Sequence, residues 1–202
     1  MTSRRTPPAG VRRRAFLAAA GASLPSLAAG QSALPSAPVA EDPSRELGLR
    51  RQEAALLHRK VDLGGVRLLR AGQAINVQPP VAHLLIVHIW AVECRPCIDE
   101  LPILRRITES LNRMPQVKIV LVSETHDLAV LNSFLSQQAA NIPRVEQYQN
   151  SDERLRSSLQ NNAQPTTLFL DALNVVRQAF LGSLKHRRSE FVDAISRMVR
   201  SL

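Results

Sequence analysis

Apolar and polar positions follow a regular pattern from about Val61 to the end of the chain. Leu84–Trp90 (LLIVHIW) and Val117–Val122 (VKIVLV) are nearly unbroken apolar runs. Such runs are typical of strands that are buried on both faces of a sheet. Before them, Val66–Leu69 and Ala74–Val77 are predicted to form a short hairpin bent around Ala71-Gly72-Gln73.

Three segments repeat apolar residues at three- and four-residue steps, the pattern of an amphipathic helix. The first runs from Ile98 to Met114, where we expect a kink at Pro102. The second is Leu128–Leu135, and the third is Phe191–Leu202. A weaker helical pattern covers Asp152–Leu159.

Near the end of the chain, two further strands are predicted at Thr167–Leu170 and Val175–Leu181. The turn Asp171–Asn174 joins them as an antiparallel hairpin. In chain order, the regular region reads βαβα followed by ββα. This order predicts an α/β domain over residues 61–202, with a central mixed β-sheet flanked by helices on both faces.

Residues 1–30 have the features of a signal peptide. An arginine-rich start is followed by the mildly apolar run Ala15–Leu27 and by small residues at Ala28, Ala29 and Gly30. The run is shorter than the roughly 20 residues that a membrane-spanning helix needs. Because Arg13-Arg14-Ala15-Phe16-Leu17 resembles a twin-arginine (Tat) signal, we expect a periplasmic or other extracytoplasmic location. An uncleaved signal would tether the protein to the membrane, and the alternative is a disordered basic tail.

Residues 31–60 separate this segment from the regular region. Gln31–Pro43 is rich in Ala, Pro and Ser, which is typical of a linker. Ser44–Lys60 is charged with scattered leucines and is a candidate for a short helix.

The formal net charge of +9 is unevenly placed. Five of the 26 Lys and Arg residues lie in the first thirty positions, where there is no acid. The remaining 21 face 17 Asp and Glu residues, so the rest of the chain carries +4. No basic stripe interleaved with aromatic residues remains there, and this argues against nucleic-acid binding.

The candidate chemistry lies in the two cysteines of the chain, in Cys94-Arg95-Pro96-Cys97. The pair follows a predicted buried strand and precedes a predicted helix. Unpaired N–H groups and the macrodipole at a helix amino terminus stabilise a thiolate at Cys94. Cys97, one turn later, can then attack a mixed disulfide and release the partner. Pro96 restrains the turn, and Arg95 would lower the pKa of the Cys94 thiol if its side chain faced the sulfurs.

Two other interpretations of the pair are weaker. Structural zinc normally has four ligands, and the chain has no third cysteine and no paired histidine motif. Its histidines are His58, His83, His88, His126 and His186. A purely stabilising disulfide across so short a loop would remove little unfolded-state entropy.

Two segments together resemble the thioredoxin superfamily, most closely its exported TlpA/ResA-like branch. His88–Cys97 (HIWAVECRPC), followed by Glu100-Leu101-Pro102, is similar to the strand–CxxC–helix segment of that branch. Gln164–Asp171 (QPTTLFLD) is similar to its cis-proline loop and the following strand. The resemblance covers roughly Val61 to Leu202 and implies a thioredoxin-like fold and thiol–disulfide oxidoreductase activity.

The resemblance also implies roles for individual residues. Pro165 should be cis and lie beside the cysteines, with Gln164, Thr166 and Trp90 contributing to partner binding. His88 stands where thioredoxins carry a buried aspartate. It would either relay a proton to or from Cys97 or be a hydrogen-bonded core histidine.

One departure concerns the charge next to the first cysteine. Glu93 stands where many relatives have tryptophan, and this acid could raise the pKa of Cys94 and oppose Arg95. The two opposite charges leave the direction of electron flow, as reductant or as oxidant, open.

The predicted function is exchange of the Cys94–Cys97 dithiol with cysteine-containing exported proteins, as a reductant. The resemblance implies substrates such as apocytochrome c, in cytochrome c biogenesis, or copper-site proteins, with electrons from a membrane thiol reductase. We expect no cofactor other than this redox-active disulfide, and no metal. The alternative is a thioredoxin-like copper metallochaperone that uses both cysteines and a histidine, although such carriers usually space their cysteines one residue wider.

Overall fold

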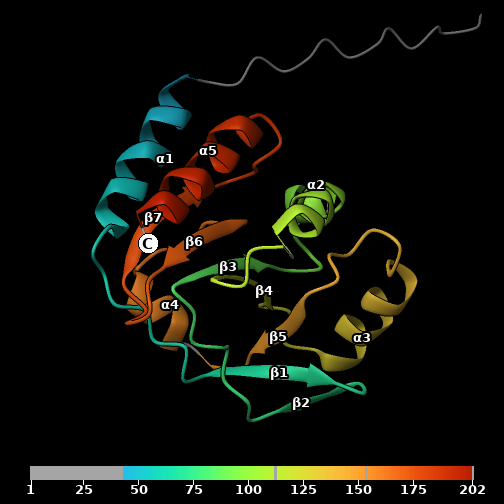
Figure 1. Cartoon of the computed structure of the whole chain (residues 1–202). Helices are drawn as coiled ribbons and strands as arrows, with labels where there is room; N and C mark the ends of the chain where they lie inside the picture. The colour runs from blue at the N-terminus through green and yellow to red at the C-terminus, as the bar shows by residue number, and fades with distance from the viewer. Residues whose placement is uncertain (1–42, 112, 153, 202) are drawn as a thin grey trace, which may run out of the picture. The chain divides into compact units, whose positions relative to one another are not determined.

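A computed structural model describes residues 43–111, 113–152 and 154–201 (Figure 1). The expected signal peptide and the first part of the expected linker, residues 1–42, lie outside the described residues. Among the helices that are described, none has the length and apolar character needed to cross a membrane.

Seven strands form one sheet in the order β2-β1-β5-β4-β3-β6-β7. The strands are β1 (Val66–Arg70), β2 (Gln73–Ile75), β3 (Leu84–Trp90), β4 (Val117–Ser123), β5 (Glu146–Asn150), β6 (Thr166–Leu170) and β7 (Val176–Leu181). Strands β3, β4 and β5 are parallel, whereas the other neighbours pair antiparallel. The predicted mixed sheet is therefore confirmed.

Helices cover both faces of this sheet. They are α1 (Pro43–Leu56), α2 (Arg95–Leu111), α3 (Leu128–Gln137), α4 (Arg154–Leu159) and α5 (Arg188–Arg200). Because side chains alternate along a strand, Leu84 and Ile86 of β3 pack with α2 and α5. Leu85 and Val87 face the opposite cluster, which includes residues of α1 and α4. Leu131 places α3 on the α2 side of the sheet.

The candidate short helix before the regular region is present as α1 and belongs to the same compact unit as the sheet. Its attachment depends on one buried carboxylate. Glu53 accepts the backbone N–H of Leu181 in β7 at 2.8 Å and pairs with the Arg187 guanidinium. Arg187 in turn lies 4.8 Å from the centre of the Phe180 ring. Leu56 adds an apolar contact with the core below it.

One strand, β5 (EQYQN), was not predicted. Its sequence has a single apolar residue, Tyr148, so it lacks the alternation by which strands are recognised. The strand forms because it fills the gap between β1 and β4 and pairs with both. Gln149 and Asn150, at its end, are buried although they are polar.

Candidate active site

Cys94 and Cys97 form a disulfide at the amino terminus of α2, with an S–S distance of 2.07 Å. The loop after β3 brings them there, and the N–H of Ile98 donates to the carbonyl of Cys94 at 3.2 Å. Cys97 is fully buried, whereas Cys94 is partly exposed. The backbone N–H of Cys97 also points at the Cys94 sulfur, 3.3 Å away. A partner can therefore reach Cys94 first, and the Cys97 N–H that donates to the Cys94 sulfur can stabilise its thiolate.

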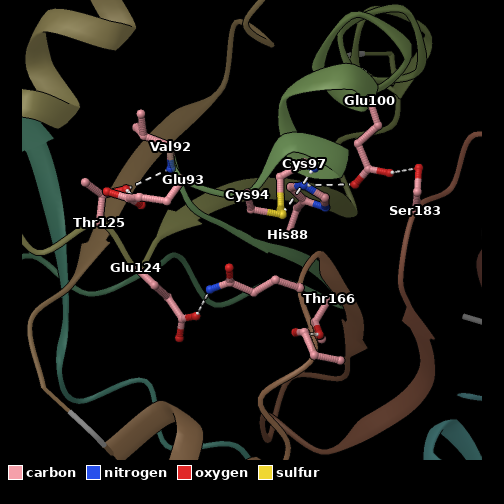
Figure 2. The surroundings of a disulfide bond; sticks show 12 residues. His88, Val92, Glu93, Cys94, Cys97, Glu100, Glu124, Thr125, Thr166 and Ser183 are labelled. Carbon is pink, nitrogen blue, oxygen red and sulfur yellow. Dashed lines mark hydrogen bonds and ion pairs between the residues drawn. A yellow bond between two sulfur atoms is a disulfide. The ribbon is translucent and has the colours of Figure 1, made fainter.

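The charges that flank the cysteines are each paired with another residue. Arg95, whose side chain is 84% exposed, forms an ion pair with Asp99 at 2.9 Å. The Glu93 carboxylate accepts a hydrogen bond from the Thr125 hydroxyl at 3.1 Å and points away from the disulfide (Figure 2). Pro96 lies in the first turn of α2, where a missing N–H breaks no helical hydrogen bond. The expected effect of Arg95 on the thiolate is thus weakened by exposure to solvent and by Asp99.

His88 and Glu100 form a fully buried pair between β3 and α2 (Figure 2). The His88 Nε2 atom lies 3.3 Å from Oε1 of Glu100, and both side chains are 0% exposed. On its other side, the His88 ring meets the Thr167 hydroxyl at 2.9 Å from Nδ1. Oε2 of Glu100 accepts hydrogen bonds from the Leu184 N–H at 2.7 Å and the Ser183 hydroxyl at 3.0 Å.

Burial disfavours the charged form of both members of this pair. It raises the pKa of Glu100 to about 7, against the opposing effect of the Leu184 and Ser183 hydrogen bonds. It lowers the pKa of His88 to about 3. Neither His88 Nε2 nor Glu100 Oε1 has a hydrogen bond to any other described group. A proton can therefore reside between these two atoms.

Glu100 stands in the Glu100-Leu101-Pro102 segment of the resemblance, but the sequence pattern alone assigns it no role. The missed signal is its position, because Cys97 and Glu100 are three residues apart and face the same side of α2. Leu101 and Leu104 continue that buried face. A glutamate on an otherwise apolar helix face is almost never fully buried unless it has a partner. Glu100 thus places a titratable group one turn from the buried cysteine.

The Gln164–Pro165 bond is cis, the geometry that the resemblance implies. Thr166 directly follows Pro165, and its backbone pairs with Ile89 of β3. In Figure 2, Thr166 is seen below the disulfide. The Thr166 side chain is buried and donates to the Ala163 carbonyl at 2.6 Å. Any contact of Thr166 with a partner would therefore use its backbone.

Trp90, for which a contribution to partner binding is predicted, lies in the core. Trp90 is 0% exposed, because β3 places it beneath α2 and α3. Its ring lies 5.6 Å from that of Phe134, centre to centre. The residue supports the site from the core and presents no surface to a partner.

No sequence-family model matches the chain, and no curated protein is similar to it in sequence. Solved structures are nevertheless similar in fold. A candidate thiol:disulfide interchange protein DsbE from Chlorobium tepidum has a TM-score of 0.54 at 14% identity, covering 70% of this chain and 96% of that one. A candidate thioredoxin from Neisseria meningitidis has a TM-score of 0.53 at 10% identity, covering 69% and 92%.

An uncharacterized thioredoxin-like protein from Porphyromonas gingivalis has a TM-score of 0.52 at 15% identity, covering 70% of this chain and 94% of that one. These similarities establish a thioredoxin-like fold for the part of the chain that the structure describes. The structure thus combines a thioredoxin-like fold with a C-x-x-C disulfide at a helix amino terminus and a cis-proline before β6.

Proposed function

We propose that the protein is an exported thiol–disulfide oxidoreductase that reduces disulfides in other exported proteins. The observation that carries the proposal is the asymmetry of the disulfide. Cys94 is accessible at the helix amino terminus, whereas Cys97 is buried on the helix face that also holds Glu100. Dithiol exchange requires a nucleophilic thiol that partners can reach and a second, resolving thiol. Cys94 fits the first part, and the buried Cys97 fits the second.

The reaction balances with no reactant other than the partner disulfide. The Cys94 thiolate attacks one sulfur of the partner, the partner's S–S bond breaks, and a Cys94–partner bond forms. Cys97 then loses its proton, and its thiolate attacks the Cys94 sulfur. The Cys94–Cys97 bond forms as the Cys94–partner bond breaks, and the partner leaves with both of its sulfurs reduced. These sulfurs take up the two protons that Cys94 and Cys97 have given up, so two electrons and two protons have passed to the partner.

The buried pair supplies a place for the proton that Cys97 must lose. His88 is uncharged and accepts at Nε2, and the adjoining Glu100 carboxyl group can take up or return a proton through Oε1. We assign the proton relay to His88 and Glu100 together. A general acid–base contribution of this kind is worth about 10²–10⁴-fold in rate.

Export and the direction of electron flow rest on the sequence. The arginine-rich start, the Arg13-Arg14 pair and the apolar run support export, and the TlpA/ResA resemblance supports a reductant. Partners would be cysteine-containing exported proteins, including those of cytochrome c maturation. Because the Cys94–Cys97 disulfide must be reduced again after each turnover in an oxidising compartment, the electron donor would be a membrane thiol reductase.

Equilibration in glutathione redox buffers tests this proposal. A reduction potential near that of thioredoxin, about −270 mV, is expected for a reductant. A potential near that of DsbA, about −120 mV, would overturn the direction and identify a disulfide-forming oxidant. Absence of a reversible two-electron couple would refute the oxidoreductase assignment.

Copper titration of the reduced protein tests the metallochaperone alternative. Within the described ranges, no three His, Cys, Asp or Glu side chains are grouped so that they could hold a metal ion. We expect no stoichiometric copper complex that involves a histidine.

A further inference from the structure

The loop before β6, residues 161–165, is held by a charged pair that the exchange chemistry does not use. Arg156 of α4 donates to both carboxylate oxygens of Glu124, which directly follows β4. The side chains are 9% and 12% exposed, so the pair is nearly removed from water. A guanidinium that meets a carboxylate through two parallel N–H groups fixes the relative orientation of the two planes.

The same guanidinium also holds the loop backbone. Nη1 of Arg156 donates to the carbonyl of Asn161 at 3.0 Å and to that of Ala163 at 3.2 Å. The side-chain amide of Gln164 donates to Oε2 of Glu124 at 2.5 Å. Three successive parts of the loop are thus bound to one ion pair.

The other end of this network reaches the strand that leads to the cysteines. The backbone N–H of Glu124 donates to the carbonyl of Trp90, the last residue of β3, at 2.8 Å. Asn150, at the end of β5, contributes a longer contact of 3.5 Å to Glu124. Since parallel strands β3, β4 and β5 end at the same edge of the sheet, Glu124 lies between the cysteine loop and the proline loop.

We propose that Glu124 and Arg156 are positioning residues that set the distance between the partner-binding backbone at Gln164 and the Cys94 sulfur. The inference rests on the proposed function and names the residues that select extended protein substrates. A partner chain bound along this loop must place its own sulfur in line with Cys94. A displacement of about 1 Å in such a loop can cost on the order of 10²-fold in rate.

A merely structural ion pair would give a different result from a positioning pair. Removing a structural pair lowers stability and lowers activity toward all substrates equally. Removing a positioning pair lowers kcat/KM for substrates that bind the loop far more than for a small disulfide that does not. The reduction potential of the cysteine couple is set at α2 and would not move.

The test compares Arg156→Lys and Gln164→Met with wild type. Arg156→Lys keeps the charge but cannot form the two-pronged contact, and Gln164→Met keeps the size of a half-buried side chain but removes its donor. Arg154→Gln is the matched control, because Arg154 lies on the same helix and its side chain is 58% exposed. For each protein, kcat/KM is measured with a disulfide-linked peptide and with hydroxyethyl disulfide, together with Tm and the reduction potential.

We expect the ratio of the two kcat/KM values to fall about tenfold in both variants, at an unchanged potential. The double variant should lose less than the product of the two single losses, because both residues act through Glu124. Equal losses with both substrates, or an unchanged ratio in Gln164→Met, would overturn the inference. In either case an active wild-type protein leaves the proposed function standing, whereas inactivity of the wild type with both disulfides would refute that function instead.

Discussion

His88 and Glu100 show how two ordinary side chains acquire unusual properties from their surroundings. Both side chains are fully buried, and burial shifts the pKa of each toward the value that favours its uncharged form. Their pKa values shift in opposite directions, so Glu100 makes stability fall as pH rises, whereas His88 makes stability rise with pH. The pair therefore predicts a measurable dependence of stability on pH.

Glu100→Gln should alter that dependence in a defined way. The folded protein keeps the Glu100 proton up to about pH 7, whereas the unfolded chain releases it near the ordinary value of 4.5. The folded state consequently loses stability as pH rises between these values, by at most on the order of 3 kcal/mol. Urea denaturation of the oxidised proteins should show Glu100→Gln gaining stability relative to wild type across this range.

The control for this prediction is Glu109→Gln, on the exposed side of the same helix, with a side chain 54% exposed. Its stability difference from wild type should be constant over the same pH range. A constant difference for Glu100→Gln as well would mean that folding leaves the pKa of Glu100 unchanged, contrary to the effect expected from its burial.

Arg95 is predicted to have only a small effect on the reactivity of the reduced site. Its side chain is 84% exposed and already paired with Asp99. Exposed ion pairs are worth about 0–1 kcal/mol, so Arg95→Ala should change the alkylation rate of Cys94 by less than about fivefold. The rate is followed with iodoacetamide on the reduced protein, with Arg106→Ala as a control at an exposed position of α2. A tenfold fall would show that the guanidinium faces the thiolate in the reduced form.

At the scale of elements, α1 shows how a helix with little apolar character becomes part of a domain. The Glu53 carboxylate joins α1 to β7 through the Leu181 N–H and to the residue before α5 through Arg187. Arg50 extends the contact to Glu190 in the first turn of α5. Paired charges thus attach α1 to the domain, whereas α2 and α5 are attached by an apolar stripe.

Glu53→Gln should therefore destabilise the protein more than its position in a charged segment predicts. The substitution removes the negative charge from a pair in which both side chains are largely buried, at a cost of about 3 kcal/mol. Glu46→Gln, whose partner contact is exposed, should cost less than about 0.5 kcal/mol. Denaturant unfolding of both variants decides the matter, and equal, small losses would show that α1 contributes little to the fold.

At the scale of the whole molecule, the sheet places a fully buried strand directly before the active site. Every residue of β3 is buried, and the strand pairs with β4 on one side and β6 on the other. The three-residue β2 lies at the sheet edge with exposed or half-buried residues. The cysteine loop is therefore attached to a rigid support.

Native-state hydrogen exchange should reproduce this gradient. Amides of β3 are expected to exchange only through global unfolding, and their free energy of opening should equal that from denaturant unfolding. Amides of β2 should open at much lower free energy. Opening of β3 below the global value would contradict a rigid support for the site.

The sequence by itself determined the elements whose side chains carry a periodic apolar signal, namely β3, β4, α2, α5 and the final hairpin. It also determined the cysteine pair, because its spacing and its place between strand and helix define the chemistry locally. The periodic signal is sufficient there because burial of apolar surface decides both the element and its orientation.

Only the tertiary structure decided the roles of polar residues inside the fold. The strand β5 exists because β1 and β4 pair with it, and its polar sequence alone does not predict it. Glu100 meets His88, and Arg156 meets Glu124, across separations of 12 and 32 residues along the chain. A buried polar group depends on the partner that lies opposite in space, and no spacing along the chain records which partner that is.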